Sequence, residues 1–406
     1  MARSTIYVGL EIGTSKVCVV VGEVRSDGAI KILGVGQHPT AGVRKGEIVD
    51  FETAQQCLHD ALVKAEDRSD VMVKNVFLAV TGSHIESLNN RGTIRIADDQ
   101  AEITPENLEE VKEIARDVSL PKENAYIHSI IQHYYVDGQE KVLNPVGMLG
   151  QKLEADYHII HGVKNRIQNA IRCVREVPLE VEDIVFSPIA AAQVVLNREA
   201  KQQGALLIDI GGGTTEYVLY IEGAVVASGC LGIGGDHITN DLSIVFKIPI
   251  GRAEKLKVDR GSAQVEGIDP EAIIDLEADS HFKGSKILQQ ELNMVISARL
   301  REVFQLLREQ LRQTGQLDKV GKGIFLIGGT SLMGGIEDLA EDIFELPVQR
   351  SSSASMSGPA AIFENPQYAT PVGLIRYAQL LDEQRPQGGS LSNICKKFGR
   401  MFGLGR

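Results

Sequence analysis

The sequence predicts an α/β protein of two duplicated lobes around a cleft, with a small α+β domain inserted in the first lobe and an amphipathic helix at the C-terminus. Three observations predict this fold: a strand–loop–strand pattern that returns about 200 residues later, a middle segment with its own periodicity, and a basic, apolar tail. The chain has 406 residues and is 43% hydrophobic, so its length suits two to three domains with cores of their own.

Composition excludes several classes of protein. No apolar stretch approaches the roughly 18–20 residues of a membrane-spanning helix, and the first residues lack the apolar region of a signal peptide. The five cysteines lie at least 39 positions apart, which excludes C-x-x-C redox or zinc motifs and favours a reducing compartment. A net charge of −12 argues against nucleic acid as a partner.

The first lobe opens with a strand, a glycine loop and two further strands. Strands at 6–10 and 17–21 flank Glu11-Ile12-Gly13-Thr14-Ser15, and a hairpin signal at 27–28 precedes a strand at 30–35.

The same order returns in the second lobe. A strand at 206–208 leads into Asp209 and Gly211-Gly212-Gly213-Thr214-Thr215, and strands follow at 217–221 and 225–227. Both lobes place an acid two residues before a glycine at the end of an apolar strand, which indicates an internal duplication.

Two such loops facing each other would bind a triphosphate and its metal ion. Glycines let backbone N–H groups approach an anion, and the Thr and Ser hydroxyls add donors. Glu11 and Asp209 are candidate Mg²⁺ ligands through water, because Mg²⁺ keeps much of its hydration, and any catalytic role of theirs would act through that metal-bound water. For either loop alone, a turn that merely reverses the chain is as plausible.

Two further elements suit the rest of a nucleotide. A buried strand at 324–327 ends in Gly328-Gly329-Thr330-Ser331, where a base or ribose could approach closely, although a tight strand–helix corner has the same pattern. Glu254 and Lys257 lie three residues apart on one helical face and are a further candidate element of the site. Such a pair is usually only a solvated salt bridge on the surface. The predicted cofactor-binding residues are Gly13, Thr14, Ser15, Lys16, Gly211, Gly212, Gly213, Thr214, Thr215, Gly234, Glu254, Lys257, Gly328, Gly329 and Thr330.

The segment 84–162 lies between a buried strand at 76–81 and a helix whose predicted apolar face is Val163, Ile167, Ala170, Ile171 and Val174. Thr104 and Pro105 are typical of a helix start, and Leu108, Val111, Ala115 and Val118 would share that helix's inner face. Leu153, Ala155, Tyr157 and Ile159 alternate with polar residues, as in a half-buried strand. The segment is therefore predicted to be a small α+β domain.

The tail predicts a membrane anchor joined by a linker at 382–391. Within 392–406, one helical face carries Ile394, Phe398, Met401 and Phe402, and Lys396, Lys397 and Arg400 lie off it. Each basic residue near anionic lipid contributes about 1 kcal/mol, whereas Gly399 and Gly403 weaken the helix. A single copy should bind anionic lipids weakly, and polymerisation would add avidity. The alternative is a helix docked on the protein's own body.

These motifs resemble the actin/Hsp70/sugar-kinase ATPase superfamily. The phosphate loops are similar to residues 9–15 and 209–214, the connecting helices to 188–192 and 370–374, and the adenosine loop to 328–331. Within it, the loop sequences, insert and tail resemble the FtsA family of bacterial division proteins. The resemblance implies an actin-like ATPase fold, ATP and Mg²⁺ as cofactors, and self-association into a filament. It also implies binding of the FtsZ C-terminal tail, recruitment of later divisome proteins, and a peripheral location on the cytoplasmic face of the inner membrane at the division site.

The resemblance also divides the chain. Subdomain 1A would comprise 1–83, 163–190 and the closing helix 365–381, with 84–162 inserted as an SHS2-like subdomain 1C. Subdomain 2A would comprise 191–238 and 312–364, and 239–311 would form subdomain 2B. A long helix at 288–311 has a predicted buried stripe of Leu292, Val295, Ile296, Leu300, Val303, Leu306 and Leu307, and Arg299 matches the FtsZ-binding region.

Some residues depart from the superfamily pattern. Glu11 and Glu216 stand where Asp is frequent, and Ser187 replaces the glutamate that orients water in chaperone-like members. Ser187 is a poor base, because its hydroxyl is not ionised near neutral pH and no histidine neighbours it in sequence. We therefore expect tight ATP–Mg²⁺ binding and at most a weak ATPase. The competing hypotheses are a sugar kinase, which needs a catalytic base, and the related type IV pilus assembly ATPase, which needs no lipid-binding tail.

Overall fold

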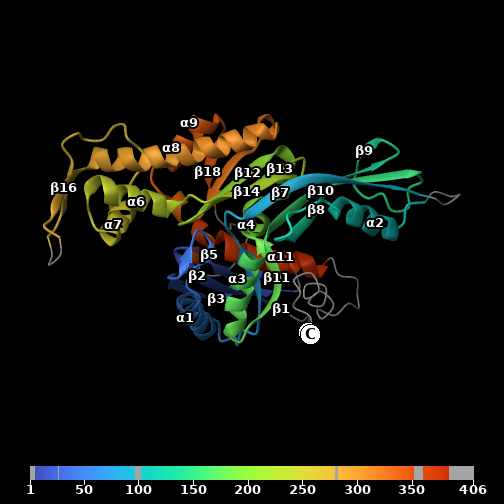
Figure 1. The fold of residues 1–406 in the computed structure, drawn as a ribbon, viewed down its shortest axis with the longest axis horizontal. Helices are drawn as coiled ribbons and strands as arrows, with labels where there is room; N and C mark the ends of the chain where they lie inside the picture. The colour runs from blue at the N-terminus through green and yellow to red at the C-terminus, as the bar shows by residue number, and fades with distance from the viewer. Residues whose placement is uncertain (1–4, 26, 97–101, 279–281, 352–359, 384–406) are drawn as a thin grey trace.

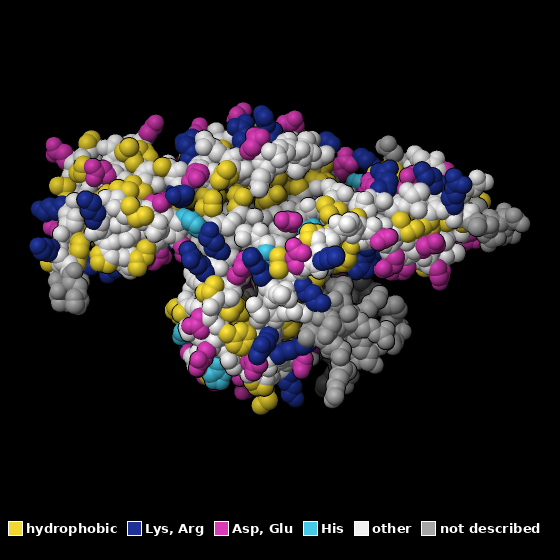
Figure 2. Space-filling view, in the orientation of Figure 1, with side chains coloured by type: hydrophobic (Ala, Val, Ile, Leu, Met, Phe, Trp, Pro, Cys, Tyr) yellow, Lys and Arg dark blue, Asp and Glu magenta, His cyan; other side chains and the backbone are white. Residues whose placement is uncertain are grey.

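The computed structural model describes residues 5–25, 27–96, 102–278, 282–351 and 360–383. Lobe 1, lobe 2 and the insert are distinct in Figure 1: lobe 1 lies below, lobe 2 lies above it, and the insert extends to the side opposite α7 and β16. Figure 2 shows charged side chains of both signs interspersed over this face. No helix within the described ranges is long and apolar enough to span a bilayer. The predicted membrane residues 392–406 lie outside the described residues.

Lobe 1 is a five-stranded sheet in the order β11-β6-β1-β2-β3. Its strands are β1 (Thr5–Ile12), β2 (Lys16–Val24), β3 (Ile30–Pro39), β6 (Asn75–Val80) and β11 (Glu180–Phe186). Alternate residues of β2 face opposite cores, because successive side chains of a strand point to opposite faces. The covering helices are α1 (Phe51–Ser69) and α3 (Lys164–Glu176) on one face and α4 (Ser187–Val195) and α11 (Ala369–Glu383) on the other.

Lobe 2 repeats this sheet in the order β14-β13-β12-β17-β18. Its strands are β12 (Ala205–Ile210), β13 (Thr215–Ile221), β14 (Ala224–Leu231), β17 (Gly323–Ile327) and β18 (Val348–Arg350). In both lobes three consecutive strands are antiparallel and the next two are parallel. This equivalence confirms the predicted duplication.

The helices of lobe 2 are α5 (Arg198–Gln203), α6 (Gly235–Phe246), α7 (Ile250–Arg260), α8 (Gln289–Gln313) and α9 (Ile336–Phe344). The hairpin of β15 (Ile273–Leu276) and β16 (Ser285–Leu288) precedes α8. The remaining elements are β4 (Val43–Arg44), β5 (Glu47–Ile48), α10 (Ala360–Phe363), and the 3₁₀ turns η1 (Leu317–Lys319), η2 (Gly329–Leu332) and η3 (Pro366–Tyr368).

The insert is a four-stranded antiparallel sheet with one helix on one face. Its elements are β7 (Ile85–Arg95), α2 (Pro105–Arg116), β8 (Asn124–Val136), β9 (Gln139–Val142) and β10 (Lys152–Val163), with the sheet order β7-β10-β8-β9. Thr104 caps α2, and the Asn107 side chain accepts from the Thr104 N–H, which completes a capping box. The predicted α+β insert is confirmed.

Four local predictions were wrong in detail. Val118 lies beyond the end of α2, and Val163 ends β10 rather than starting α3. Leu306 is 43% exposed, because α8 is covered on one side only and its buried stripe is narrower than its apolar residues suggest. The predicted linker begins later than residue 382, since α11 continues through Glu383, and the Tyr7 hydroxyl donates to the Asp382 carboxylate.

Candidate functional site

A cleft of about 410 Å³ lies between the two lobes. The glycine loops of both lobes, η2, α7 and the start of α11 line it. Every sequence-predicted cofactor residue lines the cleft except Thr215 and Gly234. The Thr215 hydroxyl donates to the Ile233 carbonyl at 2.8 Å, and the Gly234 N–H pairs with His237 Nδ1 at 3.1 Å. These two residues therefore make their hydrogen bonds to neighbouring protein groups and do not line the cleft.

The two loops close in the same way. The Gly13 N–H donates to the Lys16 carbonyl at 3.0 Å, and the Gly211 N–H donates to the Thr214 carbonyl at 2.9 Å. The strands on both sides pair in register, so each loop is a tight reversal that presents its glycines to the cleft. The duplicated sequences therefore form duplicated backbone geometry.

The loops touch each other across the cleft. A Cβ on Gly213 would lie 2.5 Å from Thr14 Oγ1 and 2.8 Å from the Cα of Lys45, so this contact requires glycine. Lys45 and Gly46 form a left-handed turn with φ of 51° and 74°, and the Gly46 N–H donates to Thr14 Oγ1 at 3.0 Å. The β4–β5 turn thus fixes the first loop against the second.

Three buried carboxyl groups converge in the cleft: Glu11, Asp209 and Glu216. Burial raises the pKa of Glu11 to about 7, that of Asp209 to about 6 and that of Glu216 to about 8. Lys16 opposes the shift at Glu11 and Asp209, whereas the charge of Asp209 raises the pKa of both other groups. Ionising all three without a cation is therefore unfavourable.

The donor set fits a hydrated divalent cation. Glu11 Oε2 is buried, with no hydrogen-bond partner among the described residues, and Asp209 Oδ2 accepts from the Thr370 hydroxyl at 3.1 Å. In the described part of the chain, no group of three or more His, Cys, Asp or Glu side chains is arranged as a metal cage. Mg²⁺ suits such a site, because it binds through one or two carboxylates, water and phosphate oxygens.

Two lysines border the cleft. Lys16 Nζ donates to the Gln367 carbonyl at 2.5 Å and lies 4.7 Å from the centre of the Tyr368 ring. Lys257 is buried, with Nζ 2.6 Å from Glu254 Oε2 and 3.1 Å from the Gly235 carbonyl. The Glu254 side chain is 48% exposed, but Lys257 is buried and also donates to the Gly235 carbonyl, so Lys257 connects this ion pair of α7 to the start of α6.

The corner at residues 328–330 packs against the second glycine loop. Gly328 has φ of 87°, and a Cβ there would lie 2.3 Å from Asp209 Oδ1. The Thr330 hydroxyl donates to the Gly211 carbonyl at 3.0 Å, which ties this corner to the second loop. Val258, Leu332 and Met333 add apolar surface to the wall, as a flat base would require.

The structure adds cleft residues that the predicted site did not include. They are Gly46, Thr81, Ser187, Glu216, Gly235, Asp236, Val258, Gly261, Leu332, Met333, Pro366, Gln367 and Thr370. Thr81 of lobe 1 donates to Glu216 of lobe 2, and the Ser187 hydroxyl donates to the Val80 carbonyl at 3.1 Å. Thr370 begins the second connecting-helix motif, and Ser187 and Glu216 lie within two residues of a motif, so the positions of these three residues were a usable signal. Thr81 and Gln367 carry none.

Arg299 lies on α8, in the part of lobe 2 that extends beyond the cleft. Its Nε and Nη2 pair with Asp241 of α6 at 2.6 and 2.9 Å, and its Nη1 pairs with Glu302. The neighbouring surface exposes Ile244 and Val245 of α6 and Ile250 of α7. Arg299 therefore holds α8 to α6 beside an apolar surface.

Comparison with known proteins agrees with the two-part architecture. Residues 206–373 match the family model "Cell division protein FtsA", and residues 82–161 match "SHS2 domain inserted in FTSA". The chain is 37% identical to cell division protein FtsA of Pseudomonas aeruginosa over 92% of its length and 89% of the relative's. For the Escherichia coli protein of that name the identity is 32%, over 92% and 90% of the two chains.

Solved structures share the fold at lower identity. The PilM–PilN type IV pilus biogenesis complex gives a TM-score of 0.66 at 17% identity, covering 94% of this chain and 99% of that chain. MreB5 of Spiroplasma citri bound to ADP gives 0.52 at 18% identity, covering 93% and 97%. These likenesses establish the actin-like ATPase fold, whereas the sequence identities separate the pilus protein from the division proteins. With its duplicated lobes, its SHS2 insert and this extent of identity, the chain belongs to the FtsA family of cell division proteins.

Proposed function

We propose that this protein binds ATP with Mg²⁺ between its lobes, polymerises on the cytoplasmic membrane and tethers FtsZ there. The observation that carries the proposal is the convergence of two duplicated glycine loops and the carboxyl groups of Glu11 and Asp209 in one cleft. The backbone N–H groups and the Thr14 and Thr214 hydroxyls would donate to a bound anion, and Glu11 and Asp209 would hold the cation through water. The MreB5 neighbour, which shares this fold, binds ADP, and this supports a nucleotide as the ligand.

The cation would neutralise phosphate charge between the loops. Lys16 adds a positive charge beside Glu11 and Asp209, and Lys257 and Glu254 also line the cleft. The Ser187 hydroxyl donates its hydrogen to the Val80 carbonyl. No histidine is among the described residues that line the cleft, so none is placed there to activate Ser187. Hydrolysis is therefore expected to be slow, and nucleotide acts mainly as a conformational and polymerisation ligand.

The partner surfaces follow from charge and exposure. The exposed Ile244, Val245 and Ile250 suit the apolar side chains of the FtsZ tail. Arg299 suits its acidic side chains and would give up part of its pairing with Asp241 to bind them. The basic, apolar tail at 392–406 supplies lipid affinity. Filament formation aligns many tails on one surface and multiplies that affinity, and later division proteins would join the assembled filament.

Calorimetric titration with ATP and Mg²⁺ tests the cleft, with Asp209→Asn as the matched variant. Heat of binding that falls sharply in the variant is expected, and no heat with the wild type would refute nucleotide binding. Co-sedimentation with anionic vesicles tests the tail by comparing the full chain with a chain that ends at Leu391. Equal pelleting of the two would refute the membrane tether.

A further inference from the structure

Strand β14 forms one edge of the lobe 2 sheet, yet several of its carbonyl groups accept hydrogen bonds from the insert. An edge strand presents unpaired backbone groups along its outer side. Here side chains of the insert occupy that side: the Asn89 amide donates to the Val226 carbonyl at 2.9 Å, and the Gln132 amide donates to the Val225 carbonyl at 2.6 Å. We call these contacts, with those of Ser87 and His158 described next, the β14 latch.

The deeper half of the latch centres on Ser228 of β14. The Ser87 hydroxyl donates to the Ser228 carbonyl at 2.7 Å, and His158 Nε2 lies 2.8 Å from the Ser228 hydroxyl. His158 Nδ1 lies 2.7 Å from Asn89 Oδ1. An amide oxygen only accepts, so Nδ1 carries the hydrogen and Nε2 accepts from Ser228. The buried imidazole therefore joins both halves of the latch into one network.

The chain enters and leaves the insert from lobe 1, but side chains of the insert form hydrogen bonds with lobe 2. It leaves lobe 1 after β6 and returns to it at α3, and β7, β8 and β10 all contact β14. At the outer end of β14, Lys141 pairs with Glu222 at 2.5 Å. The insert is thus a second bridge between the lobes, and lobe 2 cannot move against lobe 1 without breaking the latch or carrying the insert with it.

β14 is also part of the cleft machinery. Cys230 pairs in register with Glu216 of β13, and the strand continues through residues 232–234 into α6. The first carbonyl of α6, that of Gly235, accepts from Lys257. Residues 225–228, which form the latch, are therefore only a few positions along β14 from the residues next to the cleft. A movement of the cleft wall would move the latch residues as well.

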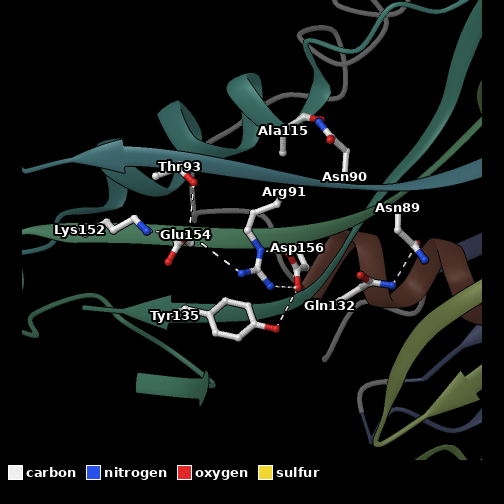
Figure 3. Close-up of polar contacts among 10 residues, drawn as sticks. All are labelled: Asn89, Asn90, Arg91, Thr93, Ala115, Gln132, Tyr135, Lys152, Glu154 and Asp156. Atoms are coloured by element: carbon white, nitrogen blue, oxygen red, sulfur yellow. Dashed lines mark hydrogen bonds and ion pairs between the residues drawn. The ribbon is translucent and has the colours of Figure 1, made fainter. Parts of the chain in front are cut away.

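The insert is built to transmit such a displacement as one body. On its outer face, Arg91 pairs with Asp156 through two hydrogen bonds of 2.5 and 2.7 Å, and the Tyr135 hydroxyl donates to the same carboxylate at 2.8 Å (Figure 3). These side chains join β7, β10 and β8, beyond their backbone pairing. The opposite face packs on α2.

We propose that the β14 latch couples nucleotide binding in the cleft to the orientation of the insert. The proposal rests on the proposed function, because it takes ATP as the cleft ligand. In this structure the latch is made while the two glycine loops touch, so the latch stabilises the arrangement in which both loops face one ligand. Coupling is reciprocal: a latch that favours ATP binding is itself strengthened by ATP.

The double variant Asn89→Ala/Gln132→Ala tests the coupling, with Asn90→Ala as its control. Both asparagines lie on β7 and each donates one 2.9 Å bond to a backbone carbonyl, but Asn90 bonds Ala115 within the insert (Figure 3). Neither Asn89 nor Gln132 is buried, so the variant should fold, and its circular dichroism melt checks this. We expect ATP–Mg²⁺ to bind the double variant about 5-fold or more weakly than the wild type, within the usual range of coupling, and Asn90→Ala to match the wild type.

Hydrogen exchange supplies the reciprocal measurement. Saturating ATP–Mg²⁺ should slow amide exchange in 224–231 and 85–95 of the wild type and of Asn90→Ala, and should do so less in the double variant. Equal affinities within twofold, tighter binding by the double variant, or exchange indifferent to ATP would each overturn the coupling while nucleotide binding stands. A wild type that binds no ATP overturns the proposed function, and the coupling with it.

Discussion

Glu216→Gln should remove a pH dependence of stability that originates in the cleft. Burial raises the pKa of Glu216 from its ordinary value of 4.5 to about 8, and the charges of Asp209 and Glu11 add to the shift. The folded protein therefore holds this proton more tightly than the unfolded chain does. Between these two pKa values the free energy of unfolding falls as the pH rises, by about 1.4 kcal/mol per pH unit.

From pH 5.5 to pH 7.5 this group should cost the wild type about 2–3 kcal/mol of stability. The substituted glutamine side chain cannot ionise and has nearly the shape of the protonated glutamate, so the variant lacks this loss and gains stability relative to the wild type by that amount. Lowered pKa values at the buried His84, His128 and His158 act in the opposite direction, destabilising the fold as the pH falls. They are common to both proteins and cancel in the difference.

Chemical denaturation without nucleotide, followed by circular dichroism at both pH values, measures the difference between the two proteins. Thr81→Val is a useful companion, because it removes the hydroxyl that donates to Glu216 and leaves the carboxyl group able to titrate. If the stability difference between wild type and Glu216→Gln changes by less than about 0.5 kcal/mol across this interval, then Glu216 is not buried as described and the reasoning fails.

Three further predictions concern the cleft and the core. Gly213→Ala should weaken ATP binding at least tenfold by calorimetry, because the new Cβ would lie 2.5 Å from Thr14 Oγ1, whereas Gly251→Ala faces open space and should not. Because burial raises the pKa of Glu11 to about 7 and that of Asp209 to about 6, binding of ATP–Mg²⁺ at pH 6.5 should release protons from the protein and weaken as the pH falls. Titrations in buffers of different ionisation enthalpy, with ATP's own protonation subtracted, detect that release, and equal heats after correction would contradict it. Leu307→Ala should cost about 2–5 kcal/mol in denaturant unfolding, whereas Leu306→Ala, 43% exposed on the same helix, should cost less than about 1 kcal/mol; similar losses would contradict the corrected stripe.

Much of the fold could be predicted because its signals are local. An acid, a glycine loop and a hairpin turn recur with the same spacing, and this recurrence alone predicted two equivalent lobes. Thr104, Pro105 and the alternation at 153–159 predicted the helix and strand of the insert, because capping and pleating depend on near neighbours. Most of the predicted cofactor residues line the cleft for the same reason: they belong to the loops that define the repeat.

The sequence by itself determined the duplicated lobes, the loop residues, the inserted domain and the chemical character of the tail. Only the tertiary structure decided that Thr81 meets Glu216 across the lobes, that Lys257 is buried while Leu306 is exposed, and that the insert covers the edge of β14. The physical reason is that a turn or a cap is fixed by residues a few positions apart. The meeting of side chains from distant segments is fixed instead by how whole lobes pack, and no local pattern encodes that packing.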